Sequence, residues 1–163
     1  QLRLFISYPQ QTLLLICPAG GCGTLPAMAT PSTTRKLLLH PELSLVTPDV
    51  LGELGLSLSP QSRNDIQVTL ETYSKGVARK NRDFKFLAGF RDERLFELRW
   101  ELQLGADFRP LRLIGAELSD LASLLLLWHL KDPSLPSETQ RQLMNQACVK
   151  AIERKNSIDT HKS

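Results

Sequence analysis

The segment 83–104, DFKFLAGFRDERLFELRWELQL, constrains the fold more than any other part of the chain. In its second half apolar side chains occupy alternate positions: Phe96, Leu98, Trp100, Leu102 and Leu104. Successive side chains of a β-strand point to opposite faces, so this alternation predicts a strand with one buried and one charged face. With the aromatic-rich first half, it predicts a β-hairpin over 84–104 that turns around 91–94.

Helix signals lie on both sides of this hairpin. Thr47-Pro48 and Ser59-Pro60 are typical helix starts, because serine and threonine cap helices and proline suits their first turn. They predict a short helix after residue 47 and an amphipathic helix over 60–81. The leucine-rich segment 116–131 is interpreted as a central core helix. Ser137 and Gln140 form a capping-box pattern that predicts a last helix ending near residue 156.

A third strand is expected at 108–114. Pro110 suggests that this strand is weak and lies at the sheet edge, because proline cannot donate a ladder hydrogen bond. The predicted order is helix, helix, strand, strand, strand, helix, helix. The sequence therefore predicts an α+β fold in which a small antiparallel sheet, the hairpin 84–104 plus a weak third strand, is covered on one face by helices.

Composition divides the chain into three parts. Residues 1–40 contain no acidic residue and are interpreted as a flexible leader, 41–156 as a single α+β domain, and 157–163 as a polar tail. The leader has three open interpretations. It could be an artefact preceding a natural start at Met28, an organellar targeting segment, or a hairpin that adds to the sheet.

Bulk properties exclude several classes. A length of 163 residues, 42% hydrophobic residues and a net charge of +3 are typical of one globular domain, and this charge alone does not indicate a nucleic-acid binder. The longest apolar run, 121–130, is far shorter than the about 20 residues that cross a membrane. No membrane span is expected. The predicted location is cytoplasmic, or organellar if residues 1–40 are a transit segment.

The cysteines predict neither a disulfide framework nor a zinc site. There are three, Cys17, Cys22 and Cys148, and no CxxC pair occurs. Cys148 falls on the apolar side of the last predicted helix, where a thiol behaves as a small hydrophobe. No cofactor or metal is predicted.

Basic residues are concentrated between 75 and 99. The candidate anion- or partner-binding residues are Lys75, Arg79, Lys80, Arg82, Lys85, Arg91 and Arg99. A cluster of this kind attracts phosphates or an acidic protein surface. Part of it also has a structural explanation, because cations are favourable near a helix C-terminus and exposed faces are commonly charged.

The order helix, three strands, helix over 60–131 resembles the double-stranded-RNA-binding domain, in element order only. That family grips phosphates with lysines at the start of its last helix. This chain carries Glu117 and Asp120 there, and acidic residues repel phosphate.

The order helix, hairpin, helix also resembles the start of many metal-dependent nucleases. Those enzymes need an aspartate and then a Glu-x-Lys on a neighbouring strand. The chain offers Asp83 or Asp92, followed by Glu97-x-Arg99 or Glu101-x-Gln103, so the lysine is missing.

The preferred hypothesis is a small non-catalytic accessory or adaptor protein that binds another protein or a second copy of itself as a homodimer. Its expected binding surface is the charged sheet face with the basic segment 75–85. The helix expected at 116–131, apolar nearly all round, would leave a further patch for a partner. The first alternative is a nucleic-acid-associated protein that uses the basic segment 75–85 and the charged sheet face. The second is a divalent-metal nuclease-like enzyme.

Overall fold

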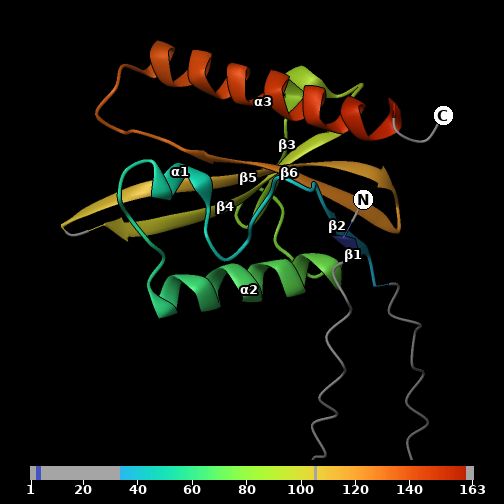
Figure 1. Cartoon of the computed structure of the whole chain (residues 1–163), viewed down its shortest axis with the longest axis horizontal. Coiled ribbons are helices and arrows are strands. Elements are labelled where there is room, and N and C mark those ends of the chain that lie inside the picture. Colours follow the sequence, from blue (N-terminus) through green and yellow to red (C-terminus); the bar gives the residue numbers. More distant parts are fainter. Residues whose placement is uncertain (1–2, 5–33, 105, 161–163) are drawn as a thin grey trace, which may run out of the picture.

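The computed structural model describes residues 3–4, 34–104 and 106–160 (Figure 1). In these ranges six strands form one mixed sheet in the order β1-β2-β6-β5-β4-β3. The strands are β1 (Arg3–Leu4), β2 (Lys36–Leu39), β3 (Phe84–Phe86), β4 (Leu95–Leu104), β5 (Asp107–Ser119) and β6 (Ala122–Leu130). The helices are α1 (Asp49–Gly52), α2 (Pro60–Ser74) and α3 (Ser137–Thr160), with a 3₁₀ turn at Ala88–Phe90.

Helices cover both faces of the sheet, with α2 and α3 on opposite sides (Figure 1). Strand β2 pairs parallel with β6, whereas β4, β5 and β6 pair antiparallel. The helical and β content agrees with an α+β protein, but the predicted arrangement is wrong. The sheet is mixed rather than antiparallel, it is larger than a hairpin with a weak third strand, and neither of its faces is left bare.

The segment 116–131 is not a helix. It forms the end of β5, a turn and all of β6. Strand β6 lies between β2 and β5, with helices on both faces, so its residues from Ser123 to Trp128 are all buried. A strand buried on both faces is a continuous apolar run that resembles a buried helix in sequence. The resemblance to the double-stranded-RNA-binding domain ends here, because its last helix is absent.

The third strand is neither weak nor at an edge. β5 has 13 residues and lies between β4 and β6. Pro110 is tolerated because it pairs with Glu101 of β4 before the pairing of β5 with β6 begins at Leu111 and Leu130. Its carbonyl accepts a hydrogen bond from Lys131 N at 2.9 Å, so the proline limits the ladder without breaking it.

The first arm of the predicted hairpin is short. Strand β3 contains only Phe84–Phe86, and the chain then forms the 3₁₀ turn before β4. Strand β4 itself is confirmed over its whole predicted apolar pattern. Strand β2 lies inside the range 1–40 that was assigned to a leader, so the described sheet includes chain before residue 41. Residues 5–33 and 161–163 lie outside the described ranges.

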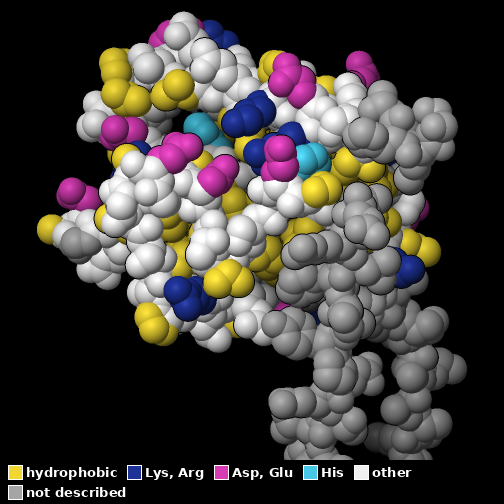
Figure 2. All heavy atoms as spheres, in the orientation of Figure 1, with side chains coloured by type: hydrophobic (Ala, Val, Ile, Leu, Met, Phe, Trp, Pro, Cys, Tyr) yellow, Lys and Arg dark blue, Asp and Glu magenta, His cyan; other side chains and the backbone are white. Residues whose placement is uncertain are grey.

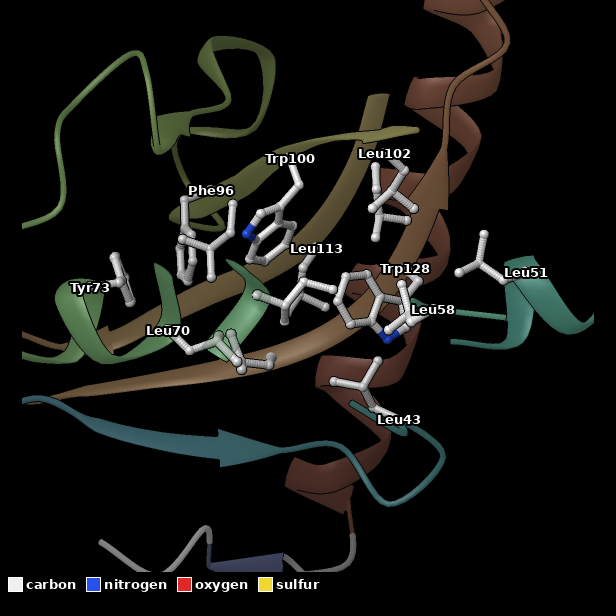
Figure 3. Packing of buried hydrophobic residues seen from close by; sticks show 14 residues of the cluster. Leu43, Leu51, Leu58, Leu70, Tyr73, Phe96, Trp100, Leu102, Leu113 and Trp128 are labelled. Carbon is white, nitrogen blue, oxygen red and sulfur yellow. The ribbon is translucent and has the colours of Figure 1, made fainter. Parts of the chain in front are cut away.

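The core on the α2 side explains why the helices form where they do. Ser59 caps α2 as predicted, since its side chain accepts a hydrogen bond from Ser62 N. Tyr73 of α2 stacks on Phe96 with ring centroids 4.9 Å apart, and Trp100 contacts Trp128 at 5.7 Å (Figure 3). Both indoles come from strands, whereas the interpretation of 116–131 as a helix placed Trp128 on a helix.

A network of hydrogen bonds joins this core to the start of β2. Arg35 donates hydrogen bonds to Tyr73 Oη at 2.9 Å and to Glu117 Oε1 at 2.9 Å. Glu117 also accepts one from Arg94 at 2.8 Å. The guanidinium of Arg35 thus connects the start of β2, helix α2 and strand β5.

Gly115 gives a direct test of the packing between β4 and β6. A Cβ at this position would lie 2.6 Å from Phe96 Cζ and 2.9 Å from the backbone oxygen of Leu124. We expect Gly115→Ala to lower the free energy of unfolding by about 1–3 kcal/mol in urea titrations, because overpacking displaces neighbours.

Gly89→Ala is the matched control, since a Cβ there would meet nothing within 4 Å. Equal stability of the Gly115→Ala variant and the wild type would contradict the close approach of β5 to Phe96.

Candidate functional site

The sheet face under α3 has an apolar end and a charged end. Below the C-terminal half of α3 the sheet presents a buried cluster that includes Leu95, Ile114, Ala116, Leu124 and Leu126, and Cys148 and Ala151 of α3 join it. Cross-strand partners share a face, and the pairing continues into a charged row made by Arg99, Arg112 and His129 of β4, β5 and β6. Lys85 and Glu97 form a second pair beside it.

A buried carboxylate lies at the centre of the charged end. Glu97 is 4% exposed, and Arg112 is 3% exposed. Glu97 Oε1 lies 3.5 Å from Arg99 Nε and 3.7 Å from Arg112 Nε. The same carboxylate therefore compensates two guanidinium groups.

Arg112 is held in place by backbone acceptors. Its NH1 donates hydrogen bonds to Trp100 O and Leu111 O, both at 3.0 Å. Its NH2 lies 3.5 Å from Glu101 Oε1. Burial lowers the pKa of Arg112, and Glu97 opposes this effect by raising it. The Nε atoms of Arg99 and Arg112 are buried and have no hydrogen-bond acceptor in the described part of the chain.

Positive charge exceeds negative charge around Glu97. The cations are Lys85, Arg99, Arg112 and Lys131, and the acids are Glu97 and Glu101. Burial lowers the pKa of Lys131; Glu97 raises it, whereas Arg112, Arg99 and Lys85 lower it further. Among the described residues, the ammonium groups of Lys85 and Lys131 form no hydrogen bond or ion pair. The arrangement leaves two cations that an anionic ligand could compensate.

Two pockets open between this charged end and the N-terminal half of α3. The larger has a volume of about 350 Å³, and its lining includes Lys85, Glu97, Lys131, Gln140 and Arg141. The smaller, about 150 Å³, includes Arg109, His129, Lys131 and Gln140. Lys131 and Gln140 line both. Figure 2 shows basic, acidic and histidine side chains gathered at the level between α3 and the sheet.

His129 supplies an uncharged imidazole to the smaller pocket. Burial lowers its pKa to about 4, with further lowering by Lys131 and Arg112. The ring is therefore neutral near pH 7, and it forms no hydrogen bond with the described residues. A neutral imidazole can accept a proton from a ligand, and the lowered pKa makes it a weaker base than an ordinary histidine.

Of the seven predicted binding residues, the structure brings Lys85 and Arg99 to the charged end of the sheet. Arg79 is paired with Asp83 at 3.1 Å. Lys80 lies 6.0 Å from the ring centroid of Phe86, beside the edge strand β3. The remaining three, Lys75, Arg82 and Arg91, are exposed and line neither pocket.

Arg112 and Lys131 were missed, and His129 was placed on a helix. The segments that carry them were interpreted as a weak edge strand and a core helix. The available signal was the polar residue Arg112 between Leu111 and Leu113, which is the alternation of a strand.

The predicted metal ligands do not gather. Within residues 34–104 and 106–160, no group of three or more histidine, cysteine or acidic side chains could hold a metal ion. Glu97, one of the two glutamates of the nuclease hypothesis, is paired with arginines. In the same part of the chain, no helix is long and apolar enough to cross a membrane.

The chain matches no protein-family model, no curated protein and no solved structure in the comparisons made with known proteins.

Removing the central carboxylate should destabilise the fold. We expect Glu97→Gln to lower the free energy of unfolding by about 3 kcal/mol, because Arg112 stays buried while its nearest carboxylate is lost. Chemical denaturation at neutral pH measures this change.

Glu101→Gln is the matched control, because its side chain is 59% exposed and exposed pairs contribute about 0–1 kcal/mol. A Glu97→Gln variant as stable as Glu101→Gln would contradict the compensating role of Glu97.

Proposed function

We propose that the chain binds nucleic acid, holding its phosphates at the charged end of the sheet under α3. The observation that carries this proposal is the surplus of cations around Glu97, with the ammonium groups of Lys85 and Lys131 unpaired among the described residues. Phosphate groups are the anions best suited to such a surplus, because each carries a charge and several acceptor oxygens.

The surface beside the pockets supports a polymeric ligand. Lys80 and Arg82 are exposed next to β3, the edge strand that also carries Lys85 of the larger pocket. Phe86, which Lys80 approaches, is 38% exposed. Exposed aromatic rings among cations are typical of surfaces on which nucleic-acid bases stack.

The adaptor hypothesis loses one of its arguments, the expected apolar patch. That argument depended on a nearly all-round apolar helix at 116–131. Residues 124–128 of this segment are strand residues buried between two helical layers, and its exposed apolar residues are Leu118 and Leu121. An acidic protein surface remains a competing ligand for the same cations, and the binding experiment separates it from nucleic acid.

Binding should depend on salt and on the two unpaired lysines. We expect fluorescence anisotropy with labelled RNA and DNA to show affinity that falls steeply as salt rises, because bound phosphates release counterions. Replacing Lys85 and Lys131 together by glutamine should weaken binding by at least about tenfold, and each lost phosphate contact should reduce the salt slope by about 1.

The control variant replaces Arg63 and Lys150 by glutamine, which removes the same charge from exposed positions that line neither pocket. Equal losses in both double variants would mean that only net charge matters. No binding of nucleic acid at low salt, with capture of an acidic polypeptide instead, would favour the protein-binding function.

A second candidate function is metal-independent cleavage of RNA. It is favoured by the smaller pocket, in which the neutral imidazole of His129 and the half-buried ammonium of Lys131 lie together. A base and an acid on the same pocket are the requirements of general acid–base catalysis. Lys131 has a lowered pKa, which makes its ammonium a stronger acid.

The chemistry would need a ribose 2′-hydroxyl. His129 Nδ1 or Nε2 would take the proton from this hydroxyl as its oxygen bonds to the adjacent phosphorus. The bond from phosphorus to the 5′-oxygen would break, and Lys131 would donate a proton to that oxygen. The products are a 2′,3′-cyclic phosphate and a 5′-hydroxyl end, and Arg109, which lines the same pocket, would stabilise the charge that builds up on the phosphate.

Cleavage is tested with labelled RNA and with the same sequence made of deoxynucleotides, both in the presence of EDTA. We expect only the RNA to be cut, and His129→Gln to slow cutting by about 10²–10⁴-fold. Lys131→Arg should retain binding but lose rate, since arginine keeps its proton.

Wild-type protein that binds RNA and leaves it intact would remove this second candidate and leave the binding proposal in place. Cleavage that His129→Gln does not slow would place the reaction elsewhere.

A further inference from the structure

The larger pocket is enclosed from two sides by different elements. Its floor comes from the sheet, with Lys85 of β3 and Glu97 of β4, and Lys131 follows directly after β6. Its roof is the N-terminal half of α3, which contributes Ser137, Gln140, Arg141, Met144 and Asn145. Lys131 therefore lies between the sheet and the N-terminal half of α3.

The size of the pocket limits what can pass. A volume of about 350 Å³ is at the low end of the range of about 300–1,000 Å³ typical of small-molecule sites. One nucleotide unit is of this size, whereas a double helix is far wider. The roof formed by α3 would keep a duplex away from the floor.

The roof is firmly anchored away from the pocket. Arg154 of α3 donates to Leu126 O at 2.7 Å, and Lys155 Nζ lies 3.1 Å from Glu93 Oε2. Cys148 and Ala151 are buried against the sheet. The position of α3, and with it the height of the pocket, is set by these contacts and not by side chains that fill the pocket.

The lining supplies groups for a phosphate and groups for a sugar or base. Lys85 and Lys131 supply cations without partners among the described residues, and Ser137 and Asn145 supply hydrogen-bonding groups. Leu87 and Met144 are partly buried apolar residues of the same lining. Contact of apolar side chains with the flat face of a base, together with hydrogen bonds to its edge, is one way in which proteins hold an unstacked base.

We propose that this pocket binds one nucleotide unit of a single strand, with its phosphate at Lys85 and Lys131 and its base against Leu87 and Met144. The inference rests on the proposed nucleic-acid binding and makes it more specific. The ligand is single-stranded, because only an unpaired nucleotide reaches the floor of the pocket.

The experiment compares one labelled sequence as a single strand and as a duplex at the same salt concentration. The single strand binds at least about tenfold more tightly, in line with the stacking of one base. Unlabelled adenosine monophosphate competes for the site better than inorganic phosphate or adenosine does, because only the nucleotide occupies both parts of the lining.

Asn145→Trp fills the pocket without changing any charge and should reduce the affinity for the single strand to that for the duplex. Gln146→Trp is the matched control, since Gln146 is the next residue of α3, is exposed and does not line the pocket. Circular dichroism of both variants checks that α3 is intact. The competition by adenosine monophosphate uses the wild-type chain and does not depend on either variant.

Equal affinity for single strand and duplex, or equal behaviour of Asn145→Trp and Gln146→Trp, overturns this inference while leaving nucleic-acid binding in place. Absence of salt-sensitive binding to every strand tested overturns the proposed function, and the nucleotide pocket with it.

Discussion

The carboxylate of Glu97 is the interaction on which the charged end of the sheet depends. It lies within 4 Å of two guanidinium groups and is almost completely buried. Unpaired charges in such a place would be expensive to bury, so without Glu97 the neighbouring cations could not share one sheet face under a helix. One carboxylate does not neutralise them all, and the remaining positive charge is the basis of the proposed function.

Helix α3 covers the charged end of the sheet, so that a pocket forms between the helix and the strands. Its C-terminal half follows the usual logic of a core, with buried Cys148 and Ala151 over Ile114 and Leu126. Its N-terminal half lies over charged strands and contributes polar residues such as Gln140 and Arg141. The C-terminal half of α3 therefore contributes to stability, and its N-terminal half contributes to the proposed binding site. The apolar half fixes the position of α3 on the sheet, and the polar half lies over the larger pocket.

The sequence predicted the elements whose patterns are local. Strand β4 alternates strictly, and Ser59 marks the start of α2, so both were found. Strand β6 is not predicted, because burial on both faces removes the alternation of apolar and polar residues and leaves a run of leucines. The misassignment of 116–131 then hid the pairing of Arg112 with His129, which depends on register and so cannot be obtained from spacing along the chain.

The candidate site was predictable only in part for the same reason. Lys85 and Arg99 belong to a basic cluster in the sequence, which predicts them as binding residues, and the sheet brings them together with Glu97. Lys75 and Arg91 belong to the same cluster, but they line neither pocket. Arg112 and Lys131 are distant from that cluster in sequence and reach the site only through strand pairing. Charge density along a chain is a poor guide to charge density on a surface when strands bring remote residues together.

The most direct test of the central claim, that the surplus charge under α3 is an anion site, is thermal unfolding of the full chain in pyrophosphate and in sodium chloride at matched ionic strength. A ligand that binds only the native state stabilises it increasingly as its concentration rises. The account predicts that pyrophosphate raises the melting temperature of the wild type, and that this rise is lost when Lys85 and Lys131 are both glutamine. Equal melting temperatures of the wild type in the two salts would contradict it.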